Sequence, residues 1–125
     1  MNAIHQAQNA YGQTNHSIRT MRGTEYDAVA RITHRLKSAA ARDPLDIVEL
    51  AGAVQDNRSM WTLFATEVAD KGNPLPQDLR ARLFYLAEFT AAHSRKVLAR
   101  QASADALVEI NTAVMRGLRD RSDSK

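Results

Sequence analysis

The amino-acid sequence predicts an all-α fold, a small bundle of four main helices preceded by a short N-terminal helix. Apolar residues recur at intervals of three and four along most of the chain, and no strand-like alternation is sustained. Proline, glycine and capping residues divide this pattern into helix-sized stretches. A chain of 125 residues can bury about two-thirds of its unfolded surface, so we expect a single helical domain over residues 1–125.

The beginning of the chain, residues 1–23, is predicted to be an N-terminal arm followed by a connector. Residues 2–18 contain no Asp, Glu, Lys or Arg, and they place Ile4 and Tyr11 at helical spacing. This pattern favours a short, weakly amphipathic helix. Glycines interrupt the sequence that follows, so residues 13–23 are expected to form the connector.

Start and stop signals bound two helices in the first half of the chain. Thr24 can cap a helix that runs to about Arg42, with acids in the first turn where the helix dipole favours them. Asp43 followed by Pro44 starts the next helix, because proline lacks only an N–H group that would be unpaired there. The run that ends at Pro74 stops this helix.

Two further helices follow in the second half. Pro76 opens a helix that extends to about Arg100, and Ser103 caps the last one. Residues 119–125 are predicted to be a frayed charged tail. The apolar positions that we expect to share one core are Leu36, Val54, Leu83, Leu86, Ile110 and Val114.

No arrangement of residues predicts catalysis, a bound metal or a cofactor. The chain has no cysteine, and no two of its four histidines have the i, i+4 spacing of a helical metal site. Its glycines are isolated, so no phosphate-binding loop is encoded. We therefore expect that the protein is not an enzyme, and that His93 is either a core-edge residue or a hydrogen-bonded helix residue.

The charge balance does not favour nucleic acid as a partner. The net charge is +3, but 14 acids are interspersed among 17 basic residues. Basic residues gather in two clusters, Arg31, His34, Arg35, Lys37 and Arg42, and Arg95, Lys96 and Arg100. Such faces can bind phosphates, which leaves RNA binding open as an alternative. An acidic run, Asp43, Asp46, Glu49 and Asp56, can instead neutralise the first cluster across a helical hairpin.

The sequence gives no sign of a membrane association. No apolar stretch approaches the ~20 residues that span a bilayer. The start of the chain lacks the basic and apolar regions of a signal peptide, since its first basic residue is Arg19. We expect a cytoplasmic protein.

Several segments resemble, in their order and spacing, the FlaF family of flagellar biosynthesis regulators over about residues 19–118. The segments are RGTEYD at 22–27, DNR at 56–58 with WTL at 61–63, LRARLFYLAEF at 79–89, HSRKVL at 93–98 and EINTAVMRG at 109–117. The resemblance implies a cytoplasmic helical protein without catalytic residues. It implies a chaperone that binds flagellin and supports its synthesis and export, acting beside the translational regulator FlbT. FlbT is the second possible direct partner, and an RNA-binding regulator of flagellin mRNA is the alternative function.

The helix predicted from Pro76 to about Arg100 carries the candidate partner-binding surface. Besides the core positions, it has Tyr85 and Phe89 one turn apart in another direction. We expect this helix and its neighbours to form an apolar groove for an amphipathic terminal helix of flagellin. Tyr85 and Phe89 would be its anchors, with Arg82 and Arg95 as flanking contacts, although core burial of the two aromatic residues is an equal alternative. Trp61 is a further candidate contact, but a lone tryptophan is more often a core residue.

Overall fold

The structure, a computed structural model, describes residues 14–123, with side chains described over 25–119. Four helices make up this part of the chain: α2 (Thr14–Ala41), α3 (Ile47–Ala69), α4 (Gln77–Leu98) and α5 (Asp105–Asp123). The described residues contain no strand, which confirms the all-α prediction. The predicted short N-terminal helix lies outside the described residues.

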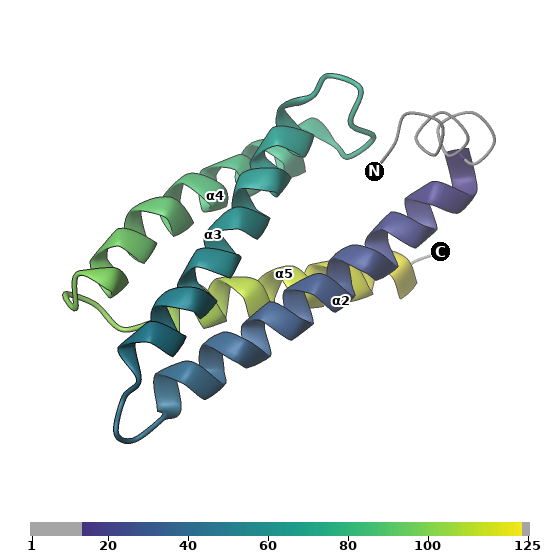
Figure 1. Ribbon diagram of the computed structural model, residues 1–125. Helices are drawn as coiled ribbons and strands as arrows, with labels where there is room; N and C mark the ends of the chain where they lie inside the picture. The colour runs from purple at the N-terminus through teal and green to yellow at the C-terminus, as the bar shows by residue number, and fades with distance from the viewer. Residues whose placement is uncertain (1–13, 124–125) are drawn as a thin grey trace, which may run out of the picture.

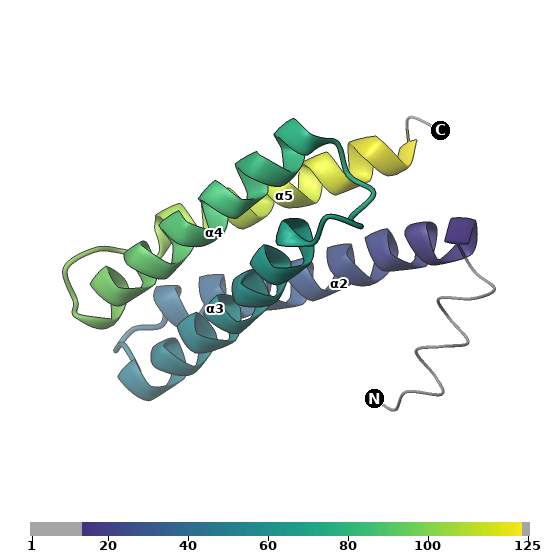
Figure 2. The same ribbon diagram turned by 90° about the horizontal axis from the view of Figure 1, so that it is seen from above.

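The helices form an up-down-up-down bundle. Short connections join consecutive helices, so neighbours in sequence run antiparallel (Figures 1 and 2). α2 packs against α3 and α5, and α4 packs against the same two helices, whereas the pairs α2 and α4 and α3 and α5 lie across the diagonals. One end of the bundle carries the α2–α3 and α4–α5 connections. The other end holds the α3–α4 connection, the start of α2 and the end of α5.

Helix α2 begins earlier than the sequence predicted. Residues 14–23, which we expected to be a connector with Thr24 as the N-cap, are helical. An isolated glycine costs a helix only about 1 kcal/mol, and a long helix tolerates that cost when its later turns pack on the bundle. The tail that we predicted to be frayed is helical as far as Asp123. Its arginines are good helix formers, so they favour continuation of α5.

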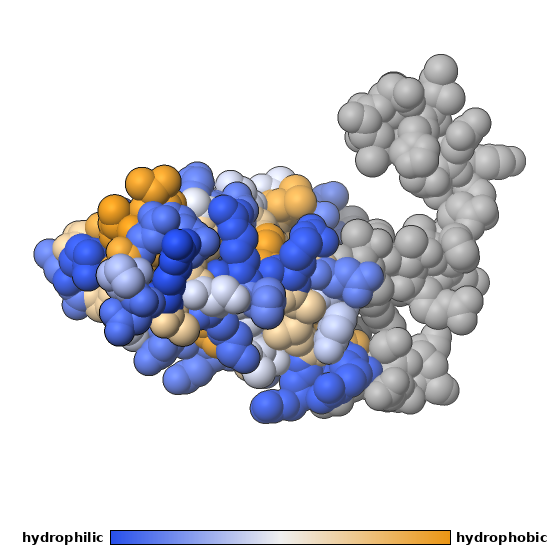
Figure 3. Space-filling view, turned by 60° about the horizontal axis from the view of Figure 1, so that its bottom comes forward, coloured by the Kyte–Doolittle hydropathy of each residue, from blue (hydrophilic) through white to orange (hydrophobic). Residues whose placement is uncertain are grey.

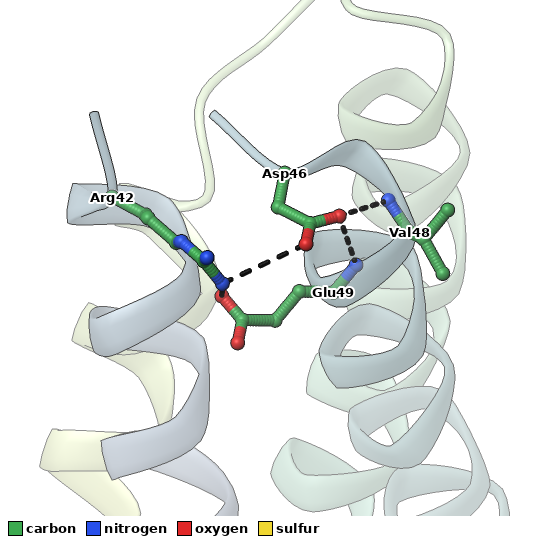
Figure 4. A network of polar contacts seen from close by, with 4 residues as sticks. All are labelled: Arg42, Asp46, Val48 and Glu49. Atoms are coloured by element: carbon green, nitrogen blue, oxygen red, sulfur yellow. Dashed lines mark hydrogen bonds and ion pairs between the residues drawn. The ribbon is translucent and has the colours of Figure 1, made fainter. Parts of the chain in front are cut away.

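Helix α3 is capped by Asp46 and not, as we predicted, by Asp43. The Oδ1 atom of Asp46 accepts hydrogen bonds from the backbone N–H groups of Val48 and Glu49, both at 3.1 Å (Figure 4). The Nη1 atom of Arg42 lies 3.2 Å from Glu49 Oε1 and 3.6 Å from Asp46 Oδ2. The cap therefore forms at the residue whose carboxylate can accept from two free N–H groups. Pro44, which we predicted at the start of the helix, lies before it.

The ends of α4 and the start of α5 follow the sequence signals closely. Pro76 immediately precedes α4. The helix ends in a Schellman motif, in which the N–H of Gln101 bonds to the carbonyl of Lys96 at 2.8 Å. Arg100 occupies the left-handed position of this motif with a φ of 63°, where glycine is usual. The Ser103 hydroxyl accepts from the N–H of Asp105 at 3.2 Å, as expected at a helix start.

The core consists of two hydrophobic clusters, so the prediction of one shared core was wrong. The first cluster contains Leu36, Ala39, Leu50, Ala53, Val54, Val97, Ala104 and Leu107. The second contains Val29, Met60, Trp61 and Ala87, with Leu83, Leu86, Ile110 and Val114 partly buried against it. The six predicted core residues are thus divided between the two clusters.

A layer of buried polar side chains separates the two clusters. It consists of Thr33 on α2, Asn57 on α3, Thr90 and Ser94 on α4, and Asn111 on α5, each no more than 3% exposed. Along each helix, the polar position lies between residues that belong to or pack against the first cluster and residues that belong to or pack against the second. We call these five residues the polar layer. Because a hydroxyl or amide interrupts the apolar stripe of each helix at the same level, the core cannot be continuous there.

A chain of hydrogen bonds runs through the polar layer across the diagonal between α3 and α5. The indole Nε1–H of Trp61 donates to Asn111 Oδ1 at 2.9 Å, and Asn111 Nδ2 donates to Asn57 Oδ1 at 2.8 Å. Thr33 donates to the carbonyl of Val29 in its own helix at 2.6 Å. The hydroxyl of Ser94 is buried with no hydrogen-bond partner among the described residues.

Replacing the central amide of this chain should destabilise the fold. Asn111→Ala would leave the Trp61 indole and the Asn57 carbonyl oxygen buried without partners, and should lower the free energy of unfolding by about 2–4 kcal/mol. Urea unfolding followed by the fluorescence of Trp61, the single tryptophan, measures this effect. Ser94→Ala is the control, because it removes a hydroxyl that has no partner and should cost much less. Equal losses for the two variants would contradict the role given to Asn111.

Removing the backbone strain at Arg100, the left-handed residue at the end of α4, should stabilise the protein. Arg100→Gly is expected to raise the free energy of unfolding by about 0.5–1 kcal/mol, because glycine adopts a φ of 63° without steric cost. The matched control Lys96→Gly, inside the same helix, should lower it by about 1 kcal/mol. Chemical denaturation of both variants provides the measurement, and a loss of stability in Arg100→Gly would show that its side chain contributes more than its backbone costs.

Candidate partner-binding groove

An apolar groove with a volume of about 330 Å³ opens at the end of the bundle that holds the α3–α4 connection. All four helices and this connection contribute to it. Its lining residues are Glu25 of α2, Phe64, Glu67 and Val68 of α3, Asn73 and Leu75 of the connection, Leu79, Arg82, Leu83 and Leu86 of α4, and Ala113, Val114, Gly117 and Leu118 of α5. We call this site the groove.

The groove exists because α4 and α5 are the least closely packed neighbours of the bundle. The α3–α4 pair diverges from the α2–α5 pair toward this end of the molecule (Figure 1). On α4, Leu79, Leu83 and Leu86 have the i, i+4, i+7 spacing of one helix face, so they form a continuous apolar wall. On α5, Gly117 has no side chain, and a Cβ atom built there would meet nothing within 4 Å.

The floor of the groove is continuous with the core. Phe64 contacts Trp61 edge to face, with ring centroids 5.4 Å apart. Trp61 is only 1% exposed and donates to Asn111 in the polar layer. The structure therefore places Trp61 beneath the groove and not on a docking surface, because its large apolar ring is fully used in packing.

Three charged residues line the groove: Glu25 of α2, Glu67 of α3 and Arg82 of α4. Burial of Glu67 against the apolar lining raises the pKa of its carboxyl group above the ordinary value of 4.5, because the charged form loses hydration. Glu67 has no ion pair among the residues that the structure describes. Asn73 holds the connection beside it, since Asn73 Nδ2 donates to the Glu67 carbonyl oxygen at 3.0 Å.

The residues that the sequence predicted as partner contacts do not all meet at the groove. Arg82 lines it, and Leu83 and Leu86 form its wall. Tyr85 and Phe89 are 64% and 39% exposed, but they lie on the outer face of α4 and do not line the groove. Arg95 is exposed in the last turn of α4, away from the groove. A helix turns about 100° per residue, so residues that follow Leu83 and Leu86 closely in sequence can face another direction.

The outer face of α4 is held in place by a histidine. The Phe89 ring stacks on the His93 ring, with centroids 5.6 Å apart and planes 11° apart. His93 Nε2 lies 2.9 Å from the carbonyl oxygen of Ser103 in the α4–α5 connection. The prediction that His93 is a hydrogen-bonded helix residue is thereby confirmed.

Sequence reasoning missed Glu67 and Gly117 as groove residues. The signal for Glu67 was its position between Phe64 and Val68, where an acid interrupts an apolar helical stripe. The signal for Gly117 was a glycine beside the apolar positions of a helix, which leaves room for close approach. Neither signal shows that the two residues face the same space, because they lie on α3 and α5.

The first basic cluster is partly neutralised by acids of the neighbouring helix, as predicted. Arg35 forms an ion pair with Asp56, and Arg42 forms pairs with Asp46 and Glu49. The Arg35 guanidinium passes over Gly52, where a Cβ atom would come within 2.9 Å of it. Arg35 and Arg42 therefore have intramolecular partners that compete with phosphate.

The face that lies at the bottom of Figure 1 is mainly hydrophilic, with separate apolar patches (Figure 3).

The described residues contain no group of three or more His, Asp or Glu side chains that could hold a metal ion. Of the helices in the described part of the chain, none combines the length and the apolar character that crossing a membrane requires.

Fold and groove together define a small four-helix bundle with an open, largely apolar groove at one end. The family model described as flagellar protein FlaF matches residues 7–118 of the chain. The protein belongs to the FlaF family. No curated protein and no solved structure matches the chain.

Protonation of Glu67 should make stability depend on pH. Because its folded-state pKa is raised above 4.5, the folded state binds more protons than the unfolded state just above that pH, and stability falls as pH rises through this window. Glu67→Gln should therefore be more stable than the wild type at pH 7, with a difference that shrinks below pH 4.5. The other charged groups that line the groove are Glu25 and Arg82, and both variants retain them. Thermal unfolding across this pH range checks the prediction, and a difference independent of pH would contradict it.

Proposed function

We propose that this FlaF-family protein binds flagellin in the cytoplasm before export and acts as its secretion chaperone. The family match supports a flagellar role. The observation that carries the proposal is the groove, because an apolar groove between helices suits an amphipathic helix better than a flat or polar partner. Flagellin's terminal segments are long amphipathic helices that need cover before they assemble. The protein then acts by binding and not by catalysis, beside FlbT.

The groove has the features of a reversible helix-binding site. Leu79, Leu83 and Leu86 offer an apolar wall of about two turns, which matches the stripe of a docked helix. On the opposite wall, Ala113 and Gly117 are small and exposed, so a partner helix can approach the α5 backbone closely. An apolar wall of about two turns limits the area that a partner can bury, which suits a chaperone that must release its client.

The outer face of α4 is the competing docking surface for the same client. Tyr85 and Phe89 are exposed there, and tyrosine is common among residues that anchor interfaces. We favour the groove because it is concave and can receive apolar side chains of a docked helix, whereas these two rings stand on a convex helix surface.

Filling the groove should weaken flagellin binding. Gly117→Leu places a side chain in open space within the groove and should weaken binding at least about tenfold, because the docked helix loses its place beside α5. Gly117→Ala is the matched control: it should bind nearly as the wild type and be more stable by about 1 kcal/mol, since alanine favours the helix. Calorimetric titration with purified flagellin measures both, and circular dichroism verifies their folding.

The outer face is tested in the same titration with Tyr85→Ala and Phe89→Ala. Wild-type affinity of both variants is expected if the groove is the site. A loss of about thirtyfold in these variants, with Gly117→Leu unaffected, would move the site to the outer face of α4. If the wild type binds flagellin mRNA with a steep salt dependence and does not bind flagellin, the chaperone function is wrong and the RNA-binding alternative holds.

A further inference from the structure

The position of Glu67 is unusual for a groove that binds an apolar helix face. Its side chain belongs to the lining together with Phe64, Val68 and Leu83, and it is described as only partly exposed. Within the described part of the chain no lysine or arginine forms an ion pair with it, although Arg82 lines the same groove. A carboxylate in this environment lowers the stability of the free protein, and leucine or glutamine would pack there at less cost.

Docking of a purely apolar helix would make this cost larger. The groove would lose its remaining water, and the Glu67 carboxylate would then be buried without a partner, which is strongly unfavourable. With a cation on the docked helix, the Glu67 carboxylate favours binding instead of opposing it. A lysine or arginine that reaches Glu67 forms a charge-assisted hydrogen bond in a largely dehydrated site, where such bonds are strongest.

We propose that the groove selects an amphipathic helix that carries a lysine or arginine within its apolar docking face, and that Glu67 recognises this cation. The inference rests on the proposed function, since the helix is one of the terminal helices of flagellin. It adds the chemistry of selection: apolar side chains fit between the α4 leucines and the small residues of α5, and the cation lies toward α3. Amphipathic helices without a cation at that level bind poorly, because they leave Glu67 buried and unpaired.

The proposal has a direct test on the protein itself. Glu67→Gln keeps the shape of the side chain and removes its charge, and it should weaken binding of purified flagellin about tenfold. Glu88→Gln is the matched control, because Glu88 is exposed on α4 outside the groove, and it should change affinity less than twofold. Circular dichroism verifies that both variants retain the helical fold.

A second set of titrations identifies the cation. Synthetic peptides of the first and last flagellin helices are prepared with each lysine or arginine replaced in turn by methionine. At one position the replacement should weaken binding to the wild type about tenfold and leave binding to Glu67→Gln nearly unchanged, because the two changes remove the same interaction. Raising the salt concentration should weaken the wild-type complex more than the Glu67→Gln complex.

The possible results separate this inference from the proposed function. If the wild type and Glu67→Gln bind flagellin equally, the role of Glu67 is wrong and the chaperone function stands. If Glu67→Gln binds weakly but every methionine peptide loses affinity to the same extent on both proteins, recognition of a cation is wrong. If the wild type binds neither flagellin nor its peptides, the proposed function and the inference fail together.

Discussion

The hydrogen bonds that link Trp61, Asn111 and Asn57 fix the arrangement of α3 and α5 across the diagonal of the bundle. Apolar packing alone tolerates sliding of one helix past another, because leucine and valine surfaces are similar at each turn. An amide that meets a second amide and an indole restricts this sliding, since a shift would break both hydrogen bonds and leave the Trp61 N–H without its partner. The remaining helices pack against this fixed pair, and the two hydrophobic clusters form on either side of it.

The groove follows from the way the core is divided. The first cluster lies toward the end of the bundle that carries the α2–α3 and α4–α5 connections, and its members are almost entirely buried. Around the second cluster, several large residues, among them Leu83, Leu86 and Val114, are only partly buried. Their exposed sides line the groove, so the same residues serve the core and the candidate binding surface. Through Phe64 and Trp61 the groove is also in contact with the polar layer.

Charge is distributed differently over the two ends of the molecule. Near the α2–α3 connection, Arg35 of α2 and Arg42, which follows α2, are paired with acids of α3, and these exposed pairs add little to stability. In the groove, Glu67 is acidic within an apolar lining, which costs stability in the free protein. Residues kept at such a cost are often those that a binding site requires. Arg35 and Arg42 at the first end thus have partners within the chain, whereas Glu67 in the groove has no ion pair among the described residues, which is the basis of the proposed cation contact.

The sequence by itself determined the four helices, most of their boundaries and the apolar stripe of α4, because helical periodicity and caps depend on residues close together in the chain. The tertiary structure shows which cap was used, since Asp43 and Asp46 both fit the local pattern and Asp46 accepts from the first N–H groups of α3. It also decided that Asn57 and Asn111 pair at the centre of the molecule, and that Glu67 and Gly117 line one groove. The Asn57–Asn111 pair and the shared groove join residues from different helices, and they depend on how those helices rotate and pack, which no local pattern encodes.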